Sequence, residues 1–115
     1  MRTLVFLLML LTLTSCSTYA PGEDKKGQEL QANGVRVLEA MRAYMDQNAR
    51  QPRSISDVVP KYLDALPAEP EIHYDAKNSR LEFIYQQEGK TGMAVACHAV
   101  IGETEWTCTG IYQQQ

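Results

Sequence analysis

Residues 80–112 decide the fold, and they read RLEFIYQQEGKTGMAVACHAVIGETEWTCTGIY. Leu81, Phe83 and Tyr85 take every second position at the start of this stretch and so share one face, a period of two that is typical of a strand with one buried face. Further strand-forming segments, separated by polar or Gly-containing turns, follow it and one precedes it. We predict strands over 72–75, 80–86, 93–101 and 105–112. Consecutive strands with short connections indicate an antiparallel meander of three or four strands.

Two of the three cysteines support the last hairpin of this meander. Cys97 and Cys108 are symmetric about the Gly102–Glu103 step, so a hairpin that turns there places them opposite each other. Opposed residues on antiparallel strands have Cα atoms roughly 4.5–5.5 Å apart, which lies within the range for a disulfide. We predict a Cys97–Cys108 disulfide, and the chain-entropy model assigns a loop of this length about 3 kcal/mol of stabilisation.

A helix precedes the strands. Between residues 28 and 50, apolar side chains recur every three or four positions, and charged side chains take most of the others. The apolar members are Leu30, Val37, Leu38, Met41, Tyr44 and Met45. This period is typical of an amphipathic helix that packs one stripe on a core. The order predicts an α+β fold, in which a long N-terminal helix and short helical turns pack on a three- to four-stranded antiparallel sheet.

The link between helix and strands, residues 52–70, contains four prolines and reads PRSISDVVPKYLDALPAEP. Ser54 followed by Asp57 is typical of a capping box, so one or two helical turns are expected there. Three apolar side chains are expected to contact the core: Val58, Leu63 and Leu66.

This link resembles the P-x-S-L-x-D-L-V-P-x-Y-L-x-x-L-P-x-x-P segment that follows the helix in many type II secretion pseudopilins. The resemblance to type IV pilin-like proteins covers residues 28–85 and includes Tyr74 in the next strand. It implies a helix, a wrapping segment and an antiparallel sheet. It transfers no catalytic residues, because these relatives are structural. Pilin-like proteins also carry a special leader and an unbroken hydrophobic helix, and the N-terminus of this chain differs from both.

The first fifteen residues are typical of a secretory signal peptide. Arg2 precedes an apolar run over residues 3–14, which is shorter than the ~20 residues that a membrane-spanning helix needs. The run ends in Leu-Thr-Ser-Cys at 13–16, which resembles a bacterial lipobox. The resemblance implies cleavage after residue 15 and acylation of Cys16. Each buried CH₂ of the acyl chains would contribute about 0.8 kcal/mol to membrane attachment.

The residues after Cys16 bear on where the protein resides. In many enteric-type lipoproteins an Asp directly after the Cys favours inner-membrane retention, so by resemblance Ser17 indicates the outer membrane, facing the periplasm. Residues 16–27 are mostly small, polar or turn-forming, and we predict a flexible tether. One domain is expected over 28–112 and a disordered tail over 113–115. The predicted disulfide suits this oxidising compartment.

The charge of the chain argues against one class of partner. The 115 residues carry a formal net charge of −3. Nucleic-acid-binding domains normally show a basic patch or stripe, so we expect no nucleic-acid partner. Membrane contact is expected through the lipid on Cys16, and the other expected partner is an envelope protein.

Four aromatic residues are the candidate contact residues: Tyr74, Tyr85, Trp106 and Tyr112. Aromatic side chains are enriched at the energetic centres of interfaces. They are also common in sheet cores, and the sequence leaves both interpretations open.

The two histidines, His73 and His98, are the candidates for a metal ligand or a catalytic base. His73, Asp75 and His98 could supply zinc ligands only if the first strand lay beside the third. Cys97 and His98 are neighbours on a strand and therefore point to opposite faces, which separates a nucleophile from its base. We predict no metal, no cofactor and no catalytic residue.

These features favour a non-enzymatic, membrane-anchored envelope lipoprotein that acts as a protein-interaction or accessory module, with a secretion or pilus-type apparatus as one setting. The alternative is a periplasmic lipoprotein that binds or inhibits a ligand or peptide. An apolar sheet patch would favour the first function, and a deep pocket with polar lining would favour the second.

Overall fold

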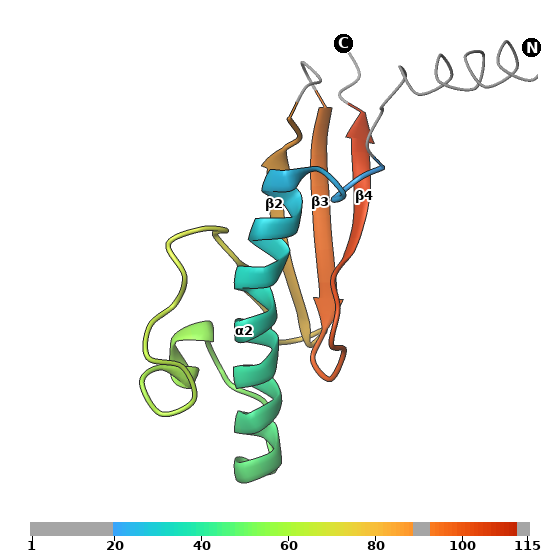
Figure 1. Ribbon diagram of the computed structural model, residues 1–115. Coiled ribbons are helices and arrows are strands. Elements are labelled where there is room, and N and C mark those ends of the chain that lie inside the picture. Colours follow the sequence, from blue (N-terminus) through green and yellow to red (C-terminus); the bar gives the residue numbers. More distant parts are fainter. Residues whose placement is uncertain (1–19, 89–92, 113–115) are drawn as a thin grey trace, which may run out of the picture.

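The computed structural model describes residues 20–88 and 93–112. The predicted signal peptide, Cys16 and the tail at 113–115 lie outside these residues. One helix lies along one face of a single antiparallel sheet (Figure 1). The elements in chain order are α2 (Lys25–Asn48), the short 3₁₀ helix η2 (Ile55–Val58), β1 (His73–Asp75), β2 (Arg80–Gln86), β3 (Met93–Val100) and β4 (Thr107–Tyr112). The predicted α+β class is confirmed.

The four strands form a meander in the spatial order β1-β2-β3-β4. Both ends of every strand lie within two residues of the prediction. The register of the last hairpin sets Cys97 opposite Cys108, as their symmetry about the turn predicted. On β2 the side chains of Leu81, Phe83 and Tyr85 are buried beneath the helix, while the alternate residues face away from it.

Helix α2 buries one stripe against the sheet. Its buried residues recur every three or four positions, and they are Gly27, Leu30, Gly34, Val37, Leu38, Ala40, Met41 and Tyr44. The helix ends where Ala49 takes a left-handed φ of 55° and donates its N–H to the carbonyl of Met45. The predicted stripe is present, but the predicted start at residue 28 is wrong, because the helix already begins at Lys25.

The proline-rich link wraps beside the helix and contains a single 3₁₀ turn. The capping box of η2 is present: the Asp57 carboxylate accepts the N–H groups of Arg53 and Ser54 at 2.9 and 3.3 Å. These two donors lower the pKa of Asp57. Val58 is fully buried as predicted, whereas Leu66 lies on the surface with 37% of its area exposed, so its predicted core contact is wrong. The loop after Pro60 carries it away from the core to the rim of a cavity.

Trp106 joins the sheet to the helix. Its ring meets Phe83 edge-to-face with centroids 4.9 Å apart. The indole also lies against Gly34 of α2, where an added Cβ would come within 2.7 Å of Nε1. Among the residues that the structure describes, no acceptor reaches this buried Nε1, so the ring holds the helix by packing. Glycine at position 34 admits this close approach.

Gly34→Ala should therefore destabilise the domain, although alanine is the better helix former. Alanine gains about 1 kcal/mol of helix propensity, but overpacking a core typically costs about 1–3 kcal/mol. We expect the free energy of unfolding to fall by up to about 2 kcal/mol in urea titrations with the disulfide intact. In a Trp106→Phe background the smaller ring leaves room, so the same substitution should be neutral or stabilising. Equal losses in both backgrounds would contradict this account.

Candidate functional site

The candidate site begins where the chain enters the domain. The prediction of a flexible tether over residues 16–27 is wrong for residues 20–27. Gly22, Asp24 and Gly27 are buried, and residues 20–24, here called the N-terminal segment, cross one end of the sheet before α2 begins (Figure 1). The first buried residue of this segment, Gly22, therefore stands six positions after Cys16.

Asp24 holds this segment in place. Its side chain is fully buried, and its Oδ1 accepts a hydrogen bond from the Tyr85 hydroxyl at 2.5 Å. Its Oδ2 accepts the backbone N–H of Glu88 at 3.2 Å. Asp24 also directly precedes the first turn of α2, where the helix dipole favours a negative charge. A buried carboxylate needs such partners, because an unpaired one is costly.

Two glycines make room for this arrangement. At Gly27 a Cβ would lie 2.1 Å from the Tyr85 hydroxyl and 2.5 Å from Oδ1 of Asp24, so only glycine admits the pair. At Gly22 the backbone has a φ of +85°, which glycine adopts readily. The carbonyl of Gly22 accepts a 2.7 Å hydrogen bond from the Gln31 side chain.

The N-terminal segment also covers the disulfide. Cys97 and Cys108 are bonded in the structure, which confirms the predicted pair. A Cβ on Gly22 would lie 2.8 Å from Cβ of Cys108 and 2.9 Å from its Sγ, so the backbone of the segment lies directly on this cysteine. The disulfide links the hairpin β3–β4, and the segment packs over it.

Tyr85 is the titratable group most affected by this environment. Burial is the largest cause that raises the pKa of its hydroxyl, followed by the hydrogen bond to Asp24 and the charge of Asp24. The neutral hydroxyl is therefore the form that the folded protein retains well into the alkaline range. Tyr85 acts here as a hydrogen-bond donor to a buried anion.

The structure separates the four predicted contact residues. Tyr85 and Trp106 are 7% and 8% exposed and belong to the core, which is the alternative that the sequence left open. Tyr74 is half-buried and donates its hydroxyl to the carbonyl of Pro52 at 2.8 Å. Tyr112 ends β4, and its side chain lies outside what the structure describes. A contact role thus stays a prediction for Tyr74 and Tyr112.

The condition for a zinc site is not met. β1 pairs with β2 and not with β3, so Glu82 lies between His73 and His98 in the ladder. Across the described ranges 20–88 and 93–112, no three His, Cys, Asp or Glu side chains are grouped closely enough to hold a metal ion. Cys97 faces the core and is bonded to Cys108, while His98 takes the opposite face of β3.

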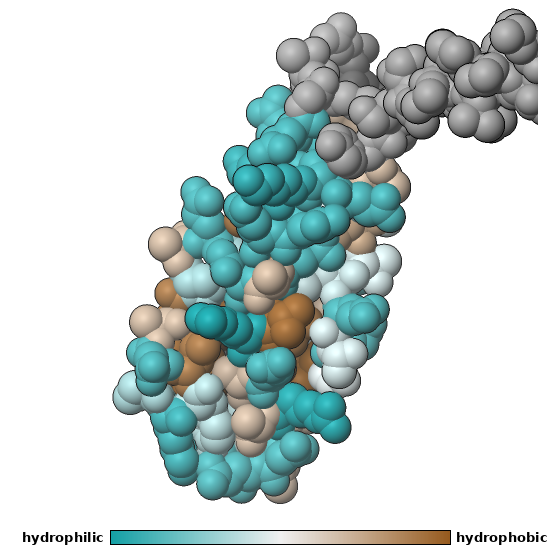
Figure 2. Space-filling model, in the orientation of Figure 1, coloured by the Kyte–Doolittle hydropathy of each residue, from teal (hydrophilic) through white to brown (hydrophobic). Residues whose placement is uncertain are grey.

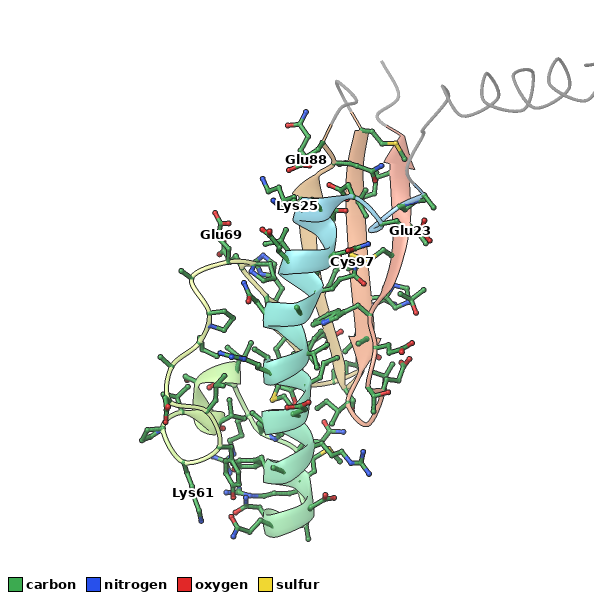
Figure 3. The ribbon with its side chains drawn as sticks, in the orientation of Figure 1. Glu23, Lys25, Lys61, Glu69, Glu88 and Cys97 are labelled. Atoms are coloured by element: carbon green, nitrogen blue, oxygen red, sulfur yellow. A yellow bond between two sulfur atoms is a disulfide. The ribbon has the colours of Figure 1, made fainter. Side chains whose placement is uncertain are left out.

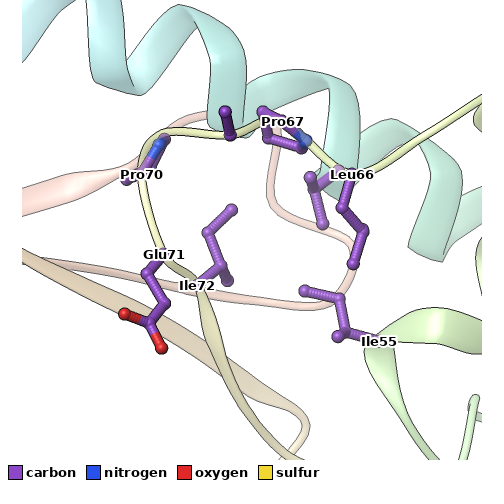
Figure 4. A pocket seen from close by; sticks show the side chains of 8 residues that line it. Ile55, Leu66, Pro67, Pro70, Glu71 and Ile72 are labelled. Atoms are coloured by element: carbon purple, nitrogen blue, oxygen red, sulfur yellow. The ribbon is translucent and has the colours of Figure 1, made fainter.

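Two hollows lie between α2 and the loop at residues 66–72. One is an apolar cavity of about 250 Å³, in which Ile55, Leu66 and Ile72 point toward one another while the Glu71 carboxylate points away (Figure 4). The other, of about 330 Å³, extends toward the N-terminal half of α2 and is lined by Lys26, Leu30, Ala68, Glu69, Pro70, Glu71 and residues 84–86 of β2. Because the hollows share lining residues, we call them together the lateral groove. Hydrophobic side chains reach the surface at the middle of this face, between hydrophilic ends (Figure 2).

Sequence reasoning missed both features. A buried Asp24 in a polar run carries no compositional mark, although its place directly before an amphipathic stretch is that of a helix N-cap. The lateral groove depends on the path that the proline-rich link takes before it enters β1.

Comparison with known proteins identifies no relative. No family model, no curated protein and no solved structure matches the chain. Within residues 20–88 and 93–112, no helix combines the length and the hydropathy needed to cross a membrane.

Tyr85→Phe should destabilise the domain by about 2 kcal/mol, because it leaves the buried Asp24 carboxylate without its hydroxyl donor. Urea unfolding of the oxidised protein measures this loss. The matched control is Tyr62→Phe, whose hydroxyl hydrogen-bonds Gln47 and Asn48 at the exposed end of α2. The control should change the unfolding free energy by less than about 1 kcal/mol. Equal effects of the two substitutions would show that the Asp24 contact has no special weight.

Alkaline pH should weaken the fold. The unfolded chain loses the Tyr85 proton near the ordinary pKa of 10.0, while the folded chain retains it, so stability is complete below pH 10 and falls as the pH rises further. Tyr74, whose pKa burial and nearby carboxylates also raise, adds to the same slope. The unfolding free energy of Tyr85→Phe, measured in urea between pH 9 and 11, should fall less steeply than that of the wild type. Identical slopes would refute the assignment.

Proposed function

We propose that the chain is a non-enzymatic lipoprotein, held by acylated Cys16 at the periplasmic face of the outer membrane, that binds another envelope protein. The observation that carries this proposal is the packed N-terminal segment. Gly22, the first buried residue of this segment, follows Cys16 by only six positions, which span at most about 21 Å when fully extended. An acyl anchor would thus keep the domain against the bilayer, with little freedom to move away from it.

This attachment orients the molecule. Glu88 and Lys25 lie at the end where the N-terminal segment crosses the sheet, and Lys61 lies at the far end (Figure 3). Under the proposal, the first end faces the bilayer and the link with Lys61 faces the periplasm. The lateral groove lies between them, accessible to a neighbouring protein.

Exposed apolar side chains support a binding role. The face of the sheet that points away from α2 carries Ile84, Val100 and Ile111, which are 57%, 41% and 38% exposed. Leu66 adds a fourth at the rim of the lateral groove. Apolar surface of this kind on a soluble domain is typical of a protein-contact face.

The apolar cavity favours one alternative, a lipoprotein that binds a small apolar ligand. Its volume of about 250 Å³ falls below the ~300–1,000 Å³ typical of small-molecule sites. It matches the size of a single inserted side chain better, so we rank a protein partner first. The element order of helix, wrapping link and antiparallel sheet is consistent with the pilin-like resemblance. We therefore propose a secretion or pilus-type apparatus as the setting.

Cys16→Ala should release the domain from membranes. The variant lacks the thiol that would carry the lipid, so cell fractionation should move the protein out of the membrane pellet, and mass spectrometry of the wild type should show an acylated N-terminal Cys. Ser17→Asp provides the matched control, because it keeps the anchor and should shift the protein to the inner membrane in an enteric-type host. A wild-type protein with an unmodified thiol or an intact leader would overturn the anchor.

A photoreactive residue placed at Ile84 or Ile111 in the anchored protein should form a discrete adduct with an envelope protein in cells. The control places the same photoreactive residue at Lys61 and measures how many adducts form by chance encounters. Adducts that appear at no position in repeated experiments would overturn the interaction module, and identification of secretion or pilus components would support the setting.

A further inference from the structure

The free edge of β2 is the feature that carries a further inference. β2 pairs with β3 along all seven of its residues, but β1 pairs only with Arg80–Glu82. We propose that the edge at Ile84–Gln86 accepts an extended, basic and apolar segment of the partner protein as an added strand. This proposal rests on the proposed function and names the kind of partner that the module would bind.

The chain itself leaves this edge open. Upstream of β1 the link passes through Pro67 and Pro70, and proline lacks the N–H that would continue a ladder. Link residues 68–71 therefore line the hollow beside residues 84–86 without pairing with them, and in the part of the chain that the structure describes no other strand takes their place. A strand edge with unpaired backbone groups is a template for another extended chain.

Residues 84–86 themselves include none of the side chains that usually protect an edge. Protected edges usually carry lysine, proline or a bulge, and Ile84 instead exposes 57% of its area. The 330 Å³ hollow of the lateral groove lies directly beside residues 84–86, with Lys26 and Leu30 on its helix side. A strand added here would place alternate side chains in the hollow and on the open face of the sheet.

The charges of the lateral groove specify the segment further. Glu69 and Glu71 line it from the loop and Lys26 lines it from α2, so carboxylates are in excess. A hydrogen bond from the Asn33 side chain to the carbonyl of Glu69, at 3.1 Å, holds this loop near the helix. Across residues 20–88 and 93–112 the only ion pair joins Arg80 to Glu82, so both groove carboxylates lack a cationic partner. A segment with a lysine or arginine would supply one, and its apolar residue would fill the groove.

The test pans the full mature chain, oxidised and in detergent, against a phage-displayed library of random nine-residue peptides. We expect enriched peptides to combine alternating apolar residues with a lysine or arginine. A synthetic copy of one should shift the amide signals of residues 84–86 in NMR spectra and protect them from hydrogen exchange. Ile84→Lys should weaken binding about tenfold or more, as loss of a central contact does, and Glu69→Lys should weaken it as well.

Thr109→Lys is the matched control, because Thr109 is an exposed β-branched residue on the same sheet face but on β4, two strands away from Ile84. It should leave peptide binding within about twofold of the wild type. Failure to enrich any peptide, or equal binding to Ile84→Lys, would overturn the added strand. Cellular adducts at Ile111 that persist after that failure would leave the interaction module standing with another surface, whereas loss of all adducts would remove the function itself.

Discussion

The hydrogen bond from Tyr85 to the buried carboxylate of Asp24 is the interaction on which the rest of the arrangement depends. It joins Asp24, the residue before α2, to Tyr85 on β2, 61 positions later in the chain. It thereby sets where the helix begins and which end of the sheet meets the N-terminal segment. Glycine is required at position 27 because the pair leaves no space for a side chain, and at position 22 because Cys108 and Gln31 leave none.

Most of the sheet could be predicted because its determinants are local. The alternation of Leu81, Phe83 and Tyr85 marks β2 at its observed bounds, and the symmetry of Cys97 and Cys108 about a turn sets the register of the last hairpin. The stripe of α2 was also predictable from its period. The start of the helix was not, because a polar Asp followed by two lysines has the composition of a linker. Only tertiary contact with Tyr85 and Glu88 makes this segment part of the domain.

The candidate site was less accessible from sequence. Aromatic residues were expected at contacts, but Tyr85 and Trp106 serve the core, since one supports Asp24 and the other packs on Gly34. The 330 Å³ hollow of the lateral groove lies where the three-residue β1 leaves the end of the seven-residue β2 unpaired, and this mismatch in length depends on the path of the link. Composition also favoured Leu66 as a core residue, and its exposure depends on the path of a proline-rich loop.

The buried carboxylate of Asp24 and the open edge of β2 are related through the orientation of the domain. A buried charge is poor evidence for stability, because an apolar residue in its place often stabilises a protein as well or better. The carboxylate instead fixes the orientation of the N-terminal segment, because Asp24 accepts hydrogen bonds from one hydroxyl and one amide in fixed directions. An apolar contact has no such directional preference. If the proposed acyl anchor holds the domain at a bilayer, this fixed arrangement would present the edge of β2 at a defined height and angle. Such presentation would lower the entropy that a partner strand loses on docking, an advantage that matters most for an edge of only three residues.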